Sequence, residues 1–333
     1  RAGSTAPASA GGGAAAAAVA PVSNVPDHDV VPRAPLPAAG GASAAVPAWV
    51  DRKAYPFNIR SLPLAEGRMN VVDHGRGEPI VFVHGTPTWS FEYRHLIRGL
   101  SETHRCLAPD HLGFGLSARP RDIAYTPEAH AVRLAEAVDL LRLDSFTLVV
   151  HDYGGPIGLP LALTEPGRVR RVVVLNSWMW GLDDDSDMRR KARMAGGRLG
   201  KFLYRRFNAS LRGLMPFAYG DRRRLTRAIH GQYLAPFPDA WSRGAVLWPL
   251  ARALLGSGAF YRQSWEQRER LRDVPALIVW GMKDRAFPPR LLERWRGALP
   301  HAAVVQLDDA GHWPHEEQPD AVLRAVRDFL AAP

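Results

Sequence analysis

The sequence predicts an α/β protein with a mostly parallel, doubly wound sheet and one inserted helical region. Short apolar runs alternate with amphipathic segments between residues 68 and 175, which predicts strands joined by right-handed helical crossovers. The alternation stops after Asn176 and returns at residue 275. The chain has 333 residues, which is enough for one large core carrying one insertion.

These changes of pattern divide the chain into four parts. Residues 1–45 are rich in Ala, Gly, Pro and Ser, and they hold too little apolar surface to offset the entropy of ordering, so we expect a disordered leader. A role in export stays open for it, although it lacks the charged start of a secretory signal. We expect the first part of the core at 46–177, a helical cap at 178–270 and the second part of the core at 271–333.

Composition indicates a globular cytoplasmic protein. No apolar run reaches the roughly 18 residues that a membrane-spanning helix needs. Cys106 is the single cysteine, so an intrachain disulfide is impossible. The net charge of +10 comes largely from arginines, including clusters at 189–191 and 222–224. A basic surface can bind nucleic acid or anionic lipid, but no nucleic-acid motif accompanies it. We therefore predict a solvated, arginine-rich helical face and no nucleic-acid partner.

The first half of the core follows in order. Residues 68–73 alternate as a strand, and the wholly apolar run 80–83 is typical of a strand buried on both faces. Thr126 and Pro127 form an N-cap and a first helical turn. The remaining predicted elements are a helix at 91–100, a strand at 105–108, a helix from 126 to about 141, and a strand at 172–175.

The stretch 148–158 carries the chemistry. Its apolar start predicts a strand, Gly154 and Gly155 allow a sharp turn, and a helical pattern follows. The residue at the turn is Asp152, whose carboxylate is already a nucleophile at neutral pH. The same residues also suit an ordinary buried strand followed by an Asp N-cap, so the neighbouring loops must decide between the two interpretations.

Two later positions complete a candidate triad. The strand at 275–280 is followed by Asp284, and the strand at 303–307 is followed by His312. Carboxyl ends of parallel strands share one edge of a sheet, so these side chains should meet Asp152 there. The chain order of nucleophile, acid and histidine is that of a hydrolase triad built on such a sheet.

Oxyanion stabilisation requires two backbone N–H groups aimed at one point. We expect them from Tyr153, which follows the nucleophile, and from Thr86, in the loop after the strand at 80–83. Pro87 has no N–H, so it can only fix this loop.

These motifs resemble the α/β-hydrolase superfamily, in the branch that holds haloalkane dehalogenases and epoxide hydrolases. The resemblance extends from about residue 49 to 331 and is carried by the segments 84–90, 109–117, 151–159 and 311–319. It implies that Asp152 displaces a leaving group to form an alkyl ester. His312, held by Asp284, then activates the water that cleaves this ester. No cofactor or metal is expected, and the partners are a small apolar electrophile and water.

Two positions depart from the dehalogenase pattern. The family usually has Trp after the nucleophile and often Asn in the first loop, and both stabilise the halide; here they are Tyr153 and Thr86. Candidate leaving-group stabilisers are Tyr153, Thr86, Trp178 and Trp89, with Trp180 a further indole in the same region.

Three alternatives to halide displacement remain open. Epoxide hydrolysis would need an acid from cap tyrosines, and Tyr204, Tyr219, Tyr233 and Tyr261 lie in that region. Opening of a β-lactone also suits an aspartate nucleophile. A non-catalytic protein that binds small molecules is the third. Metal ligation is not expected, because the remaining core histidines (His84, His111, His151 and His315) show no ligand spacing.

Overall fold

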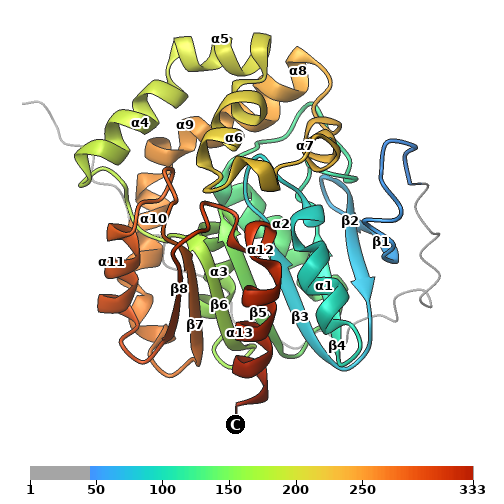
Figure 1. Cartoon of the computed structure of the whole chain (residues 1–333), viewed down its shortest axis with the longest axis vertical. Coiled ribbons are helices and arrows are strands. Elements are labelled where there is room, and N and C mark those ends of the chain that lie inside the picture. The colour runs from blue at the N-terminus through green and yellow to red at the C-terminus, as the bar shows by residue number, and fades with distance from the viewer. Residues whose placement is uncertain (1–45, 333) are drawn as a thin grey trace, which may run out of the picture. The chain divides into compact units, whose positions relative to one another are not determined.

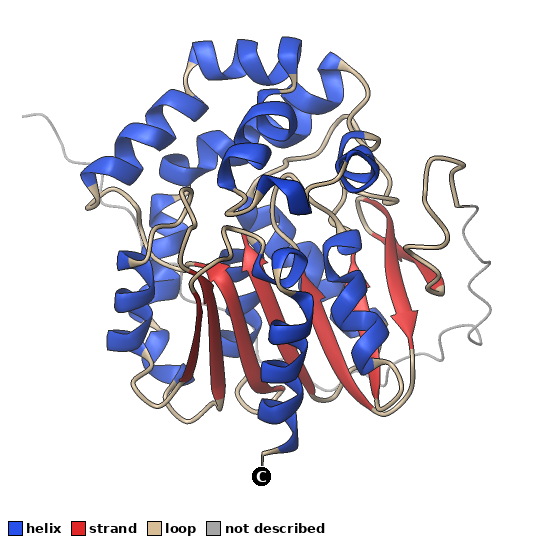
Figure 2. Cartoon of the chain, in the orientation of Figure 1, coloured by secondary structure: helices blue, strands red, loops and turns tan. Residues whose placement is uncertain are grey.

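The computed structural model describes residues 46–332, and its centre is one eight-stranded sheet in the order β1-β2-β4-β3-β5-β6-β7-β8 (Figure 2). The strands are β1 (Ile59–Leu64), β2 (Gly67–His74), β3 (Glu78–Val83), β4 (His104–Pro109), β5 (Phe146–Asp152), β6 (Val169–Ser177), β7 (Ala276–Gly281) and β8 (Ala303–Leu307). In this spatial order, every pairing from β4 onward is parallel. Strand β2 pairs antiparallel with both of its neighbours, β1 and β4. The prediction of a mostly parallel sheet is therefore confirmed.

Helices cover both faces of this sheet. Figure 1 shows α1 and α13 in front of the strands and α2 and α3 behind them. The covering helices are α1 (Arg94–Leu100), α2 (Pro127–Leu140), α3 (Gly154–Thr164), α11 (Arg290–Ala298), α12 (Pro314–Glu317) and α13 (Pro319–Ala331). The Thr126 hydroxyl caps α2 by accepting a hydrogen bond from the N–H of Ala129, as its sequence position predicts.

Between β6 and β7 the chain forms only helices. They are α4 (Ser186–Gly196), α5 (Arg198–Phe207), α6 (Met215–Ala218), α7 (Arg227–Leu234), α8 (Ala240–Ser242), α9 (Trp248–Gly256) and α10 (Gly258–Glu266), with short 3-10 or π turns between some of them. Figure 1 shows α4 to α9 above the carboxyl ends of the parallel strands, where α/β proteins place their ligands.

The central strands explain where the core lies. All seven residues of β5 and all six of β7 are buried, because helices lie against both faces of the sheet. The edge strand β1 is only partly buried, and it pairs with β2 through a tight turn. We did not expect β1, because its sequence lacks the long apolar run of a central strand.

One further expectation needs a small correction, and another concerns residues that the structure does not describe. The helix expected at 91–100 begins as a 3-10 turn, Ser90–Tyr93, and becomes α1 only at Arg94. The leader expected at 1–45 lies outside the described residues. Within the described part, none of the helices combines the length and apolarity required to cross a bilayer.

Candidate active site

Asp152 ends β5 in a sharp turn. Its φ is +50°, a left-handed conformation that costs a non-glycine residue about 1–2 kcal/mol and therefore needs support from its surroundings. The next residues must be small: a Cβ on Gly154 would lie 1.9 Å from the carbonyl oxygen of Val83, and one on Gly155 would lie 2.0 Å from Ser177 Oγ. The two glycines thus allow α3 to start directly beneath the Asp152 carboxylate.

The Asp152 carboxylate is held at both oxygens. The backbone N–H of Thr86 donates to Oδ1 at 2.8 Å. Nε2 of His312 lies 3.3 Å from Oδ2. One oxygen is therefore held by the loop after β3, while the other faces the imidazole that follows β8.

Asp284 fixes the far side of the imidazole. Its Oδ2 lies 2.7 Å from Nδ1 of His312 and also accepts the Nδ2–H of Asn176 at 2.8 Å. Its Oδ1 accepts the backbone N–H groups of Ala286 and Phe287 at 2.7 and 2.9 Å. The structure thus brings together the three residues expected to form the triad.

Asn176 was not among the expected site residues. Its side chain donates to Asp284 and to the carbonyl of Gly281, and its Oδ1 accepts the N–H of Gly281. This amide therefore ties the end of β6 to the end of β7. The signal that could have found it is its position directly after a buried apolar strand, which is the argument that identified Asp284.

Charge around His312 determines its protonation. Burial alone lowers the pKa of the imidazole, but the negative charge of Asp284 and the hydrogen bonds to Asp152 and Asp284 outweigh burial and raise the pKa to about 10. The resting site at neutral pH is therefore an imidazolium held between two carboxylates.

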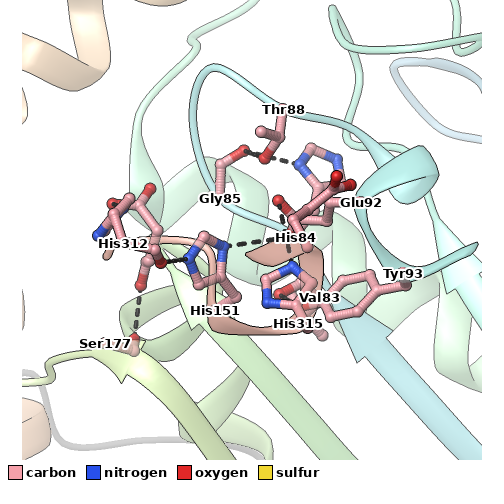
Figure 3. A network of polar contacts seen from close by, with 12 residues as sticks. Val83, His84, Gly85, Thr88, Glu92, Tyr93, His151, Ser177, His312 and His315 are labelled. Atoms are coloured by element: carbon pink, nitrogen blue, oxygen red, sulfur yellow. Dashed lines mark hydrogen bonds and ion pairs between the residues drawn. The ribbon is translucent and has the colours of Figure 1, made fainter. Parts of the chain in front are cut away.

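A second polar cluster, centred on His151, lies beside His312 (Figure 3). Nε2 of His151 lies 2.8 Å from the carbonyl oxygen of His312, and its Nδ1 lies 3.2 Å from Glu92 Oε1. A carbonyl can only accept, so Nε2 donates its N–H to the carbonyl of His312, while Nδ1 forms a hydrogen bond with the carboxyl group of Glu92. His151 thereby positions the backbone of the residue that faces the nucleophile.

The same cluster is the one group of possible metal ligands in the described part of the chain. Glu92, His151 and His315 each have a ligand atom within 4.8 Å of the others, and all are buried. Both nitrogens of His151 are already engaged by hydrogen-bond partners. His151 is therefore better described as a hydrogen-bonded support for the backbone of His312. The ring of His315 stacks on Tyr93, and its two nitrogens have no hydrogen-bond partner among the described residues.

A cavity of about 250 Å³ lies between the sheet edge and the helices above it. Asp152, His312, Thr86 and Tyr153 line its sheet side. Its other walls are mostly apolar and come from α4, α5, α6, α9 and the segments beside them; the apolar members include Met188, Ala192, Leu214, Met215, Phe217, Ala251, Leu254 and Phe287. Such a space suits a small apolar ligand placed against a carboxylate.

The expected leaving-group donors fall into different places. Thr86 lines the cavity, and its hydroxyl is buried without a partner among the described residues. The Tyr153 ring also lines the cavity, but its hydroxyl donates to the carbonyl of Leu250. Of these two residues, Thr86 is therefore the one whose hydroxyl remains free.

The two indoles are outside the cavity wall. Nε1–H of Trp89 donates to the carbonyl of Gln232 at 3.0 Å, so this group is not available to a leaving group. Trp178 packs edge-on against the Tyr153 ring at 4.8 Å, and its buried N–H has no partner among the described residues. It contacts the ring beside the nucleophile rather than the cavity itself.

One of the four tyrosines expected in the cap, Tyr204, lines the cavity. Burial raises its pKa to about 12. The hydroxyls of Tyr233 and Tyr261 donate to Glu316 and to the carbonyl of Ala253, and Tyr219 stacks on Trp313. The cavity wall in the described residues therefore holds one tyrosine from this region, not the pair that epoxide opening usually employs.

Known proteins resemble this chain over most of its length. The family described as the alpha/beta hydrolase fold matches residues 78–319. Haloalkane dehalogenase 2 of Mycobacterium tuberculosis is 36% identical over 277 residues, covering 83% of this chain and 96% of that protein. The cis-3-alkyl-4-alkyloxetan-2-one decarboxylase of Xanthomonas campestris is 35% identical over 295 residues, covering 83% and 97%.

A solved structure gives the same result. The haloalkane dehalogenase DatA of Agrobacterium tumefaciens superposes with a TM-score of 0.70 at 28% identity, covering 82% of this chain and 96% of that one. The matched range includes β3, β5, β6, β7 and β8, whose carboxyl ends carry the groups described above. The chain is therefore a hydrolase that belongs to the α/β-hydrolase family, in its haloalkane dehalogenase-like branch.

Proposed function

We propose that this enzyme cleaves a carbon–halogen bond in a small apolar haloalkane, with residues 178–270 acting as the cap over the site. The observation that carries the proposal is the Asp152 carboxylate in a mostly apolar cavity. Its Oδ1 is held by the Thr86 N–H at 2.8 Å, and its Oδ2 lies 3.3 Å from His312. Such a carboxylate is shielded from water and can attack an alkyl carbon.

The first step of the proposed reaction needs no proton donor. One Asp152 oxygen forms a bond to the alkyl carbon as the carbon–halogen bond breaks, and the halide leaves with the bonding electrons. The product is an alkyl ester on Asp152. By our proposal the hydroxyl of Thr86 donates a hydrogen bond to the departing halide, which is supported by Thr86 lining the cavity and by its hydroxyl having no other partner in the described residues.

Esterification prepares the second step. Asp152 loses its negative charge, so one of the two carboxylates that hold the His312 pKa high no longer does so. The imidazolium then releases its proton to solvent more readily, so that the halide and this proton both depart, and the neutral imidazole becomes a base. His312 takes a proton from water, the hydroxide attacks the ester carbonyl of Asp152, and the bond between the carbonyl carbon and the alkoxy oxygen breaks. The departing oxygen takes the proton of the newly formed Asp152 carboxyl group and leaves as the alcohol, which restores the carboxylate and the imidazolium. The N–H of Thr86, and by our proposal that of Tyr153, stabilise the oxyanion.

The experiment is intact-protein mass spectrometry of the full-length His312→Ala variant. Without its base the enzyme should accumulate the ester. Incubation with 1-bromohexane and with 1-chlorohexane should give the same mass gain, one hexyl group on Asp152, because the halogen leaves. The matched control, His312→Ala combined with Asp152→Asn, should show no gain. Unequal gains from the two haloalkanes, or none in a folded protein, would contradict the proposal.

Opening of a β-lactone is the second candidate. It is favoured by the decarboxylase relatives, which are 34 and 35% identical to this chain, close to the 36% of Haloalkane dehalogenase 2, and by the aspartate, which can open a strained ring. A lactone provides a carboxylate leaving group that stays attached to the alkyl carbon. In the same variant, a lactone adduct would therefore retain all of the substrate's atoms, whereas a haloalkane adduct lacks the halogen.

We place this chemistry in the cytoplasm, where the single cysteine, Cys106, remains a thiol. Burial raises the pKa of that thiol to about 12, so it is unreactive at neutral pH. The proposed reaction uses water and this chain's own side chains and requires no cofactor.

A further inference from the structure

The exposed apolar side chains of this molecule are concentrated on one segment. Seven of the eight large hydrophobic residues that are exposed in the described part of the chain lie between Met194 and Phe217, and the eighth is Val132. Single exposed hydrophobic residues are ordinary, but such a concentration marks an interaction surface. We call the segment from Met188 to Gly220 the apolar–basic surface.

This segment also carries most of the net charge. Between Met188 and Gly220 there are nine Lys and Arg residues and no Asp or Glu, a net +9 out of the +10 of the whole chain. Arg190 and Lys191 pair with Asp187, just outside the segment. The other seven have no carboxylate partner among the described residues. The charge is thus largely available to an anionic partner.

Helix α5 shows how the two properties combine. Gly200 and Tyr204 are its buried residues. Leu199, Phe202, Leu203 and Phe207 follow the spacing of one helical face and are 70, 56, 37 and 55% exposed. Lys201 and Arg205 lie on a neighbouring face, also exposed. A helix that turns a stripe of Leu and Phe to solvent beside a basic face is the pattern of helices that lie in a membrane interface.

The cavity reaches the same surface. Leu214 and Phe217 line the cavity that contains Asp152, yet they are 49 and 46% exposed. Lys191 and Ala195 of α4 also line it. Residues of the apolar–basic surface therefore form part of the cavity wall, from which we infer that the cavity opens on this surface. Figure 1 shows α4 and α5 at the end of the molecule opposite its C-terminus.

We propose that the apolar–basic surface docks this enzyme on an anionic lipid bilayer. Apolar side chains would enter the boundary between headgroups and acyl chains, and the arginines and lysines would face lipid phosphates. A second copy of the chain fits less well, since a two-fold contact would press two +9 segments together. Nucleic acid would use the charge but would leave the Leu, Met and Phe side chains of the surface largely without a role.

Docking has a consequence for the substrate, and this step rests on the proposed function. With its mouth at the bilayer, the cavity takes a lipophilic alkyl substrate directly from the membrane rather than from water. Vesicle binding does not depend on that chemistry, so the docking proposal and the proposed function are tested separately.

The test is co-sedimentation of the full chain with vesicles of phosphatidylcholine, with or without an equal part of phosphatidylglycerol. We expect binding to the anionic vesicles that weakens with salt, and little binding to pure phosphatidylcholine. Each membrane-facing charge contributes about fivefold to binding, so Arg198→Glu/Arg206→Glu should weaken binding by about tenfold or more. Leu199→Ser/Phe202→Ser/Phe207→Ser should also weaken it by about tenfold or more.

Matched controls exist elsewhere on the surface. Arg222→Glu/Arg224→Glu makes the same change of net charge on another exposed arginine cluster, and Val132→Ser removes an equally exposed apolar residue. Both should bind vesicles as the wild type does. All variants should turn over a water-soluble haloalkane normally, since none of these residues lines the cavity.

Three results would overturn the docking proposal. One is the absence of binding to anionic vesicles by the wild type. Another is an equal loss in the Arg222/Arg224 control, which would mean that net charge alone acts. The third is loss of dimerisation or of nucleic-acid binding, but not of vesicle binding, in the α5 variants. If vesicles bind and the His312→Ala variant forms no ester, the docking stands and the proposed chemistry fails.

Discussion

The two walls of the active-site cavity are built from different kinds of contact. On the sheet side, both carboxylates have defined partners: Thr86 and His312 for Asp152, and His312, Asn176 and two backbone N–H groups for Asp284. On the helical side the wall is mostly apolar, and its one tyrosine, Tyr204, lies among methionine, alanine and leucine side chains.

This difference separates two tasks. Directional hydrogen bonds fix the reacting atoms within a few tenths of an ångström, which the chemistry requires. Apolar packing fixes only shape and volume, and it tolerates exchange of side chains of similar size. Under the proposed function, the sheet side therefore determines which reaction occurs, and the helical side determines which alkyl chain fits.

The largest expected effect comes from a buried ion pair on the sheet side that also accepts a hydrogen bond from the helical side. Arg94 of α1 forms a buried, two-bond ion pair with Glu316 of α12, and the hydroxyl of Tyr233 in α7 donates to the same carboxylate. Arg94→Leu leaves that carboxylate buried without its cation and should cost about 3–5 kcal/mol of unfolding free energy. Urea unfolding followed by circular dichroism measures this loss.

Two further variants test the reason for it. Arg98→Leu, on the exposed face of the same helix, should cost well under 1 kcal/mol. Arg94→Leu/Glu316→Leu should be less destabilised than Arg94→Leu, because no unpaired charge remains. If Arg94→Leu unfolds like Arg98→Leu, the buried ion pair does not stabilise the fold.

The charge of His312 on the sheet side should make the free energy of unfolding depend on pH. The pKa of His312 is about 10 in the folded protein, against 6.5 for an ordinary histidine. A raised folded-state pKa adds stability that is fully present below about 6.5 and is lost as the pH rises through about 10. The wild type should therefore lose unfolding free energy over this range relative to His312→Gln.

Urea unfolding at a series of pH values gives the difference between the two proteins. Groups other than His312 titrate in both, so their contributions cancel in the comparison. A difference that stays constant from pH 6.5 to 10 would show that His312 is not charged between its two carboxylates.

The smallest expected effects come from removing a single hydroxyl group, one from each side of the cavity. Thr86→Val keeps the backbone N–H that holds Asp152 and removes the hydroxyl, so halide departure should slow by about tenfold. Tyr204→Phe removes the tyrosine hydroxyl on the helical side and should change the rate by less than about threefold. Single-turnover alkylation of the two variants with 1-bromohexane measures both. The reverse order would assign leaving-group stabilisation to Tyr204.

The sequence could predict the sheet side because each group there follows a recognisable strand. Asp152, Asp284 and His312 come directly after apolar runs, and parallel topology brings such ends together. The support behind them was harder to see: Glu92 lies in the 3-10 turn before α1 and is distant from His151 in sequence.

The helical side could be predicted only as a class of structure. The sequence indicates helices after Asn176, but which tyrosine or indole reaches the cavity depends on how these helices pack. Trp89 and Tyr153 illustrate this point, since the indole N–H and the hydroxyl both bind backbone carbonyls in the 178–270 region. The local sequence around either residue does not contain that partner.

The hydrogen bond from Tyr153 to Leu250 makes the nucleophile sensitive to the size of the ligand. Leu250 belongs to α9, and Tyr153 directly follows Asp152. A ligand large enough to displace α9 must stretch this bond or pull on the turn that holds the carboxylate. Bulky substrates should therefore react more slowly as well as bind more weakly, so the length of the substrate's alkyl chain should affect the rate of the bond-breaking step itself.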